Sequence, residues 1–259
     1  MSKNFEVLQR AQRDREFLGT TRTPVIPLPA PAANPPLPLS RTELMVPELD
    51  AAVHDEVDKL IQRLFLLSAN AASPHVVLFT GVGPGDGNSW ICARAGEMAA
   101  AKLAGSVCVV DANFRSPTLH ECFGVPNDGG LTGATVESGP MRNFAHQLGN
   151  TNLWFVPCGT AGSDIGRLIS SDRLRTRLAE LRTEFDYVLI DSPAAGVYND
   201  AVILGQLTDG VVLVVGASTA RRDMALRAME SLAAAKVRVL GAVLNRRTFP
   251  IPEALYRRF

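Results

Sequence analysis

The sequence lacks any apolar run of the roughly 18 residues that a membrane-spanning helix needs, and its N-terminus is too polar for a signal peptide. It also lacks net charge, because 26 basic residues balance 26 acidic ones, so no overall field favours nucleic acid or an anionic membrane. Its four cysteines, Cys92, Cys108, Cys122 and Cys158, show no paired metal-ligand spacing and mostly lie in apolar runs. These absences predict a cytoplasmic protein that does not bind nucleic acid. The 46% hydrophobic content across 259 residues is ample for one globular core.

Three regions follow one another along the chain. Residues 1–20 carry apolar side chains at helical spacing among many charges, which predicts a short amphipathic helix. Residues 21–45 form a proline-rich linker, because seven prolines between 23 and 39 exclude a helix or a central strand. The globular domain is predicted to span residues 46–259. It opens with a helix over 48–67 whose apolar stripe should dock on the rest of the domain; its members are Leu49, Val53, Val57, Leu60, Ile61, Leu64 and Phe65.

From residue 75 onward, continuous apolar runs alternate with amphipathic segments. Continuous runs are typical of strands covered on both faces, so the pattern predicts a mostly parallel sheet in a three-layer α/β/α fold. The predicted strands are 75–80, 106–112, 152–159, 186–192, 210–217 and 237–245, and the predicted helices are 89–104, 171–184, 200–207 and 220–235. Ligands of such sheets bind at the carboxyl ends of the strands.

The stretch GVGPGDGNSW, residues 81–90, lies between the first predicted strand and the first helix that follows it. A glycine loop in that position can turn its amides inward around a phosphate, and the helix dipole adds partial positive charge. The Ser89 hydroxyl at the start of that helix is suited to coordinating Mg²⁺. A glycine-rich turn without a ligand remains the alternative.

Two later apolar runs each end in an aspartate, Asp111 and Asp191. Strand-end carboxylates beside a glycine loop favour a metal and nucleotide site, although a lone aspartate in such a place often forms a turn or a helix cap.

These three segments together resemble the motifs of the bacterial tyrosine kinases of capsule and exopolysaccharide synthesis, P-loop relatives of the partition ATPases. The resemblance covers roughly residues 47–249. The family's loop reads T-S-x-x-P-G-E-G-K-S, and here Gly81 replaces the serine and Asn88 replaces the lysine. In the motifs I-D-A-D-x-R-x-P and D-Y-x-x-x-D-x-P-P, Asn113 replaces the second acidic residue and Ala194 the last proline. The positions that match are Thr80, Pro84, Gly85, Asp86, Gly87, Ser89, Asp111, Ala112, Arg115, Pro117, Asp186, Tyr187, Asp191 and Pro193.

The resemblance implies roles for single residues. Ser89, Asp111 and Asp191 would hold Mg²⁺, directly or through water. Asp111 and Asp191 would be the catalytic residues, with Asp111 helping to activate the accepting hydroxyl. Residues 85–89 would face the phosphates of ATP or ADP. Arg115 is a candidate substitute cation, unless it pairs with a surface carboxylate. Asn245 resembles the family's adenine-side asparagine, with a polar cap at the end of a strand as the alternative.

The resemblance also implies partners. Family members regulate a membrane polysaccharide co-polymerase, which would place this chain in the cytoplasm, peripheral to the inner membrane. The opening MSKNFEVLQRAQ resembles kinases encoded beside exosortase systems. Family kinases assemble in rings that phosphorylate C-terminal tyrosine clusters, but this tail offers Tyr256 alone, and the contact motif E-x-x-R-x-x-R is matched only at Glu56 and, conservatively, at Lys59. The sequence therefore neither predicts nor excludes a homo-oligomer.

Asn88 stands where the family's loop has lysine, and this difference determines the activity that we expect. Phosphoryl transfer depends on electrostatic stabilisation of spreading negative charge, which a neutral amide does not provide. We therefore expect weakened or lost kinase activity in a protein that still binds nucleotide. The alternatives are an active ATP-dependent tyrosine kinase that uses another cation, a partition-type positioning ATPase, and a scaffold that binds no nucleotide. The partition class usually carries a further lysine early in its loop, which Gly81, Val82 and Gly83 do not supply.

Overall fold

The computed structural model describes residues 51–67, 73–162, 164–217 and 221–246. The predicted helix of residues 1–20 and the predicted linker of residues 21–45 lie outside the described residues, as does the tail that contains Tyr256. Within the described residues, no helix combines the length and the apolar character needed to cross a membrane.

The described residues form a seven-stranded sheet in the order β3-β4-β2-β5-β1-β6-β7. Every neighbouring pair is parallel except β3 and β4, which are antiparallel. The strands are β1 (Val76–Gly81), β2 (Val107–Asp111), β3 (His146–Gln147), β4 (Leu153–Val156), β5 (Tyr187–Ser192), β6 (Gly210–Gly216) and β7 (Val239–Asn245).

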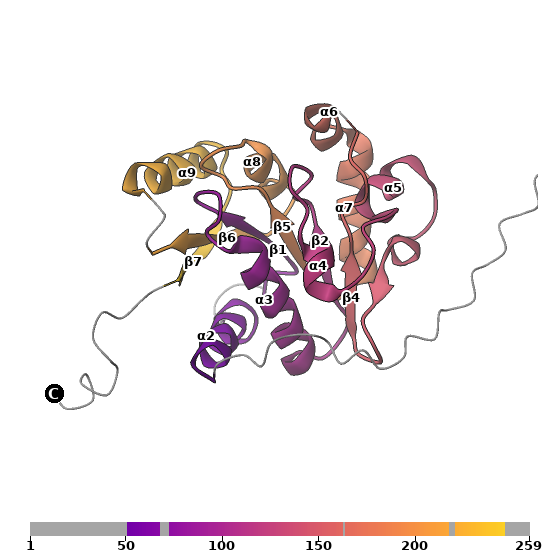
Figure 1. Ribbon diagram of the computed structural model, residues 1–259, viewed down its shortest axis with the longest axis horizontal. Helices are drawn as coiled ribbons and strands as arrows, with labels where there is room; N and C mark the ends of the chain where they lie inside the picture. Colours follow the sequence, from indigo (N-terminus) through magenta and orange to yellow (C-terminus); the bar gives the residue numbers. More distant parts are fainter. Residues whose placement is uncertain (1–50, 68–72, 163, 218–220, 247–259) are drawn as a thin grey trace, which may run out of the picture. The chain divides into compact units, whose positions relative to one another are not determined.

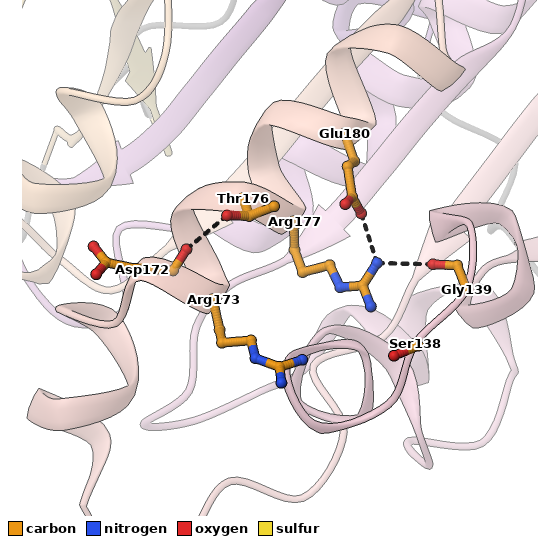
Figure 2. Close-up of a pocket in the computed structure, with 7 residues that line it drawn as sticks. All are labelled: Ser138, Gly139, Asp172, Arg173, Thr176, Arg177 and Glu180. Atoms are coloured by element: carbon orange, nitrogen blue, oxygen red, sulfur yellow. Dashed lines mark hydrogen bonds and ion pairs between the residues drawn. The ribbon is translucent and has the colours of Figure 1, made fainter.

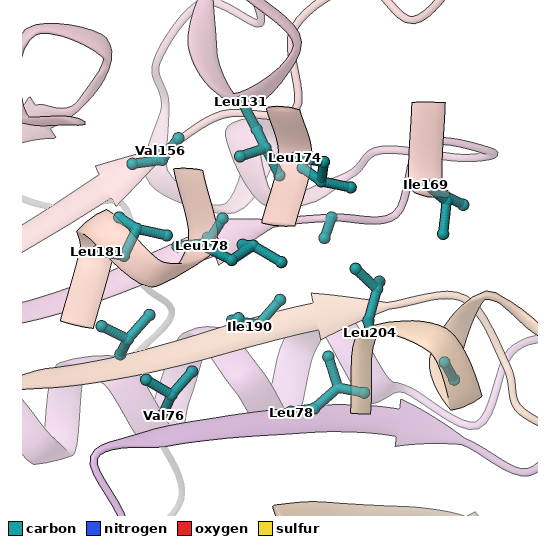
Figure 3. Packing of buried hydrophobic residues seen from close by; sticks show 14 of the residues in the cluster. Val76, Leu78, Leu131, Val156, Ile169, Leu174, Leu178, Leu181, Ile190 and Leu204 are labelled. Carbon is teal, nitrogen blue, oxygen red and sulfur yellow. The ribbon is translucent and has the colours of Figure 1, made fainter. Parts of the chain in front are cut away.

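Helices cover both faces of the sheet. Successive side chains of a strand point to opposite faces, so the buried residues of each strand divide between two clusters. Val76 and Leu78 of β1 belong to one buried cluster, and Val77 and Phe79 belong to the other. The first cluster is completed by α5 (Gly130–Val136), α6 (Ile165–Ile169), α7 (Asp172–Glu184), α8 (Asp200–Gly205) and α9 (Arg222–Ala234), and the second by α2 (Ala51–Ile61), the π-helical turn η1 (Gln62–Leu66), α3 (Asn88–Lys102) and α4 (Leu119–Phe123). Figure 1 shows these layers, and Figure 3 shows leucines of α7 packed above Ile190 and Val76 of the sheet. The predicted α/β fold with a mostly parallel sheet is confirmed.

The apolar stripe predicted at the start of the domain docks as expected. Val57, Ile61, Leu64 and Phe65 are buried against α3 and the sheet, and Val53 and Leu60 are partly buried there. Leu49 lies outside the described residues.

The prediction that both faces of every strand are covered is wrong for β7. None of its seven residues is fully buried. It is the last strand in the sheet order, and among the described residues it pairs only with β6. An edge strand can therefore carry a continuous apolar run that would otherwise predict a central position.

Candidate functional site

The glycine loop between β1 and α3 requires glycine at two of its positions. Gly85 and Gly87 have φ angles of +78° and +85°, in the left-handed region that other residues rarely adopt. A Cβ on Gly87 would lie 2.3 Å from Asn245 Nδ2 at the end of β7. The Asn245 amide also donates to the Asp86 carbonyl at 2.8 Å. Asn245, predicted to lie beside adenine, therefore contacts the loop itself.

Asp86 folds its side chain into the loop. The residue is 1% exposed, and its Oδ2 accepts a hydrogen bond of 2.8 Å from the Gly83 amide. A phosphate in the loop would compete with this carboxylate for that amide. Asp86 was predicted to face the phosphates, and in the structure its side chain is buried in the loop and accepts from the Gly83 amide.

Asn88, at the position of the missing lysine, turns its amide toward the ends of the strands. Its Nδ2 donates to the Phe79 carbonyl at 3.1 Å, to the Ser192 carbonyl at 3.0 Å and to the Asp191 carboxylate. Three surrounding acceptors fix which end of the amide is nitrogen. The buried Oδ1 has no hydrogen-bond partner in the described part of the chain.

Ser89 and Asp191, two predicted Mg²⁺ ligands, lie in direct contact. The Ser89 hydroxyl donates to Asp191 Oδ2 at 2.6 Å, while Asp191 Oδ1 accepts from Asn88. A hydroxyl and a carboxylate at this separation fit two positions of a magnesium coordination shell that substrate phosphates and water would complete. Across the described residues no group of three or more His, Cys, Asp and Glu side chains is arranged for metal binding, so a metal here would depend on such outside ligands.

Asp111 lies beside Asp191, because the register of β2 and β5 pairs the two residues directly. Both are fully buried. Burial raises the pKa of Asp111 to about 6, and burial together with the Asp111 charge raises the pKa of Asp191 well above its usual range. No described lysine or arginine forms an ion pair with either carboxylate. The site therefore favours retained protons or a bound cation.

Asp111 also organises the turn that follows β2. Its Oδ1 accepts from the Asn113 amide at 3.0 Å, and its Oδ2 accepts from the Leu119 amide at the start of α4 at 3.2 Å. The turn-forming role left open for a strand-end aspartate is thus present. The catalytic role of Asp111 stays a prediction.

Arg115 pairs with a carboxylate, but with the buried Asp200 and not with the surface carboxylate of the alternative interpretation. Its Nε and Nη2 donate to Asp200 at 2.6 and 3.0 Å, and its guanidinium lies 4.0 Å from the centre of the Tyr198 ring. Asp200 is only 5% exposed, so this bidentate pair joins the turn after β2 to the start of α8. No contact links Arg115 to Asn88 or Asp191 among the described residues.

The backbone acceptors of the site could not be predicted from the sequence. The carbonyls of Phe79 and Ser192 hold the Asn88 amide, yet carbonyl groups are the same at every residue, so no motif marks them. Asp200 and Tyr198 could be found only as neighbours of the third motif.

Two surface cavities lie away from this site. One of about 540 Å³ is lined by α7 and by Ser138 and Gly139, and a second of about 950 Å³ lies between α5 and α6. Figure 2 shows that the buried Arg177 in the first cavity already donates to the Gly139 carbonyl and to Glu180. Neither cavity is lined by a predicted site residue.

Comparison with known proteins finds relatives that share this arrangement of strands and loops. The family model described as "Cellulose biosynthesis protein BcsQ" matches residues 75–239. Tyrosine-protein kinase YwqD of Bacillus subtilis is 30% identical over 169 residues, which are 65% of this chain and 71% of that protein. Tyrosine-protein kinase CpsD of Streptococcus pneumoniae is 28% identical, over 66% of this chain and 75% of that protein.

A solved structure shows the same fold. The chimerical protein CapA2B2 superposes with a TM-score of 0.70 at 24% identity, covering 75% of this chain and 85% of that one. The family match spans the loop, both aspartates and the strands that carry them. This chain therefore belongs to the family of the cellulose biosynthesis protein BcsQ and of the bacterial tyrosine kinases of capsule and exopolysaccharide biosynthesis.

Proposed function

We propose that this protein is a nucleotide-binding member of its family with weak or lost tyrosine-kinase activity, and that it regulates a membrane polysaccharide co-polymerase. The observation that carries the proposal is the position of Asn88. Its amide is occupied by two strand-end carbonyls and by Asp191, and it brings no positive charge to the loop.

Nucleotide binding rests on the parts of the loop that are kept. Gly85 and Gly87 hold the left-handed turns that direct backbone amides, and α3 begins at Asn88 with its N-terminus at the loop. Ser89 and Asp191 would hold Mg²⁺. When bound, Mg²⁺ neutralises phosphate charge and orients the nucleotide.

The loss of phosphoryl transfer follows from the missing cation. A charge-assisted hydrogen bond contributes about 1.5–3 kcal/mol, or roughly ten- to a hundredfold in affinity, and the transition state carries more charge than the bound nucleotide. Arg115 is the predicted substitute, but Asp200 and the Tyr198 ring hold it elsewhere. Binding is expected to survive better than turnover.

The proposed setting follows from the family. A regulatory subunit of this family would act in the cytoplasm and reach the inner membrane through its co-polymerase partner, as a homo-oligomer or as single copies bound to it.

Titration calorimetry with magnesium ATP and ADP tests the proposal. We expect wild-type protein to bind weakly, and Asn88→Lys to bind about tenfold or more tightly than Asn88→Met, which matches the length of lysine without its charge. Single-turnover phosphate transfer to Tyr256, followed by mass spectrometry, should be detectable only with Asn88→Lys. Transfer by wild-type protein at the rate of Asn88→Lys would show an active kinase. Absence of binding in every variant would favour a scaffold.

A further inference from the structure

The first turn of α9 packs against the start of the glycine loop. The terminal methyl group of Met224 lies 3.6 Å from the position that a Cβ on Gly83 would occupy, and 3.5 Å from the same position at Gly196. Gly196 follows β5, and its amide donates to the Val82 carbonyl at 3.1 Å. The loop, the segment after β5 and the start of α9 therefore meet, so α9 borders the candidate site although none of the three motifs includes it.

Arg221 lies at the beginning of this turn. It is the N-cap residue of α9, and its carbonyl accepts from the Met224 amide at 3.0 Å and from the Ala225 amide at 3.1 Å. Residues three apart lie on the same side of a helix, whereas residues two apart do not. Arg221 therefore shares the side of α9 that Met224 turns to the loop, and Arg222 does not.

The Arg221 side chain has no partner among the described residues. The residue is exposed, and it forms no ion pair or side-chain hydrogen bond with that part of the chain. Helix stability does not explain a cation here, because positive charge is unfavourable at the N-terminus of a helix. The guanidinium of Arg221 is thus available to a ligand beside Gly83.

The charge of a bound nucleotide would need such a cation. Its phosphates would lie close to the buried carboxyl groups of Asp111 and Asp191, and Mg²⁺ would offset only part of their negative charge. Asn88 is neutral, and Arg115 is held by the start of α8. Arginine stays charged at physiological pH and binds phosphate through two parallel N–H···O bonds. Arg221 therefore combines the right chemistry with a position next to the loop.

We propose that the Arg221 guanidinium binds the phosphates of the nucleotide and supplies the positive charge that Asn88 lacks. This inference rests on the proposed nucleotide binding, and it concerns affinity rather than phosphoryl transfer. The family's lysine would extend from position 88 at the start of α3, whereas Arg221 approaches from the start of the loop, on the side of Gly83 and Gly196. Nucleotide affinity then depends on a residue outside the three motifs.

Titration calorimetry of the full chain with magnesium ATP tests the role of Arg221. Arg221→Gln should weaken binding about tenfold, because a hydrogen bond between charged groups contributes at least that much, and Arg221→Lys should retain most of the affinity. Arg227→Gln is the matched control, since it removes the same charge from an exposed position about 9 Å further along α9 at 1.5 Å per residue. Its affinity should stay within about twofold of wild-type protein. Without nucleotide, all these variants should melt at the wild-type temperature, which excludes misfolding as the cause.

The outcomes separate this inference from the proposed function. Equal losses in Arg221→Gln and Arg227→Gln would overturn the role of Arg221 and leave nucleotide binding intact. Absence of binding by both wild-type protein and Asn88→Lys would refute nucleotide binding itself, and the role of Arg221 with it.

The Asn88→Lys background tests the same role where binding is tighter. The restored lysine would share the phosphate charge with Arg221, so the two effects should not add. In this background Arg221→Gln should weaken binding about threefold, less than in the wild-type chain, and Arg227→Gln should again have little effect. Equal affinities of these two variants in the Asn88→Lys background would also overturn the proposal.

Discussion

The buried carboxylate Asp111 should make the free energy of unfolding depend on pH in a direction unusual for an aspartate. Burial raises its pKa from 3.8 to about 6, so the folded state holds a proton that the unfolded state releases. This contribution is fully present below about pH 4 and is lost as pH rises through about 6. At 1.36 kcal/mol per pKa unit it amounts to about 3 kcal/mol.

Urea unfolding of wild-type protein and Asp111→Asn between pH 4.5 and 7.5 measures this contribution. Asparagine stays neutral, so the stability of wild-type protein relative to Asp111→Asn should fall by about 2 kcal/mol over that range. Aspartates with lowered pKa values, such as Asp186 and Asp209, respond in the opposite sense, but they occur in both proteins and cancel in the difference. A difference that stays constant with pH, or that grows in favour of wild-type protein, would refute the assigned environment of Asp111.

Two further substitutions test the packing of the glycine loop and the hydrogen bonds that α7 makes through Arg177. Gly87→Ala should lower the unfolding free energy by about 1–3 kcal/mol, because alanine is strained at the observed φ and its Cβ meets Asn245 Nδ2. Adding Asn245→Gly should restore part of this lost stability. If it restores none, the clash with Asn245 is not a cause of the loss. Arg177→Met should lower the unfolding free energy by about 1–3 kcal/mol in the same urea titration, because it leaves the buried Ala134 carbonyl without its donor and also removes the bond to the Glu137 carbonyl. An effect below about 1 kcal/mol would show that water replaces the guanidinium.

The fold was predictable because its strands are continuous apolar runs and the α2 stripe repeats at helical spacing. The four predicted helices that follow the glycine loop begin and end within about two residues of α3, α7, α8 and α9, whereas the predicted helix of residues 48–67 corresponds to α2 and the π-helical turn η1. The short elements α4, α5, α6 and β3 were not predicted, since segments of two to seven residues are too short to show a hydrophobic period. Their positions depend on contacts between distant segments, such as the Asp111 carboxylate at the start of α4.

The sequence predicted which residues form the candidate site better than it predicted where their side chains point. Motif spacing brought Asp111 and Asp191 to neighbouring strand ends, which the register confirms, and Ser89 at the start of α3 contacts Asp191. It could not show that the Asn88 amide turns to backbone carbonyls or that Arg115 is held by Asp200. Those outcomes depend on competition between hydrogen-bond partners that are far apart in sequence, and the nucleotide and metal roles of these residues stay predictions.

The contact between Asn245 and the Asp86 carbonyl joins residues 159 positions apart. During synthesis the loop leaves the ribosome long before the strand that holds it, and chains of this size commonly pass through partly folded intermediates. The loop should therefore reach its final shape only after nearly the whole domain has been translated. Nascent chains that stop before residue 245 should lack a competent loop even when the central strands have already formed.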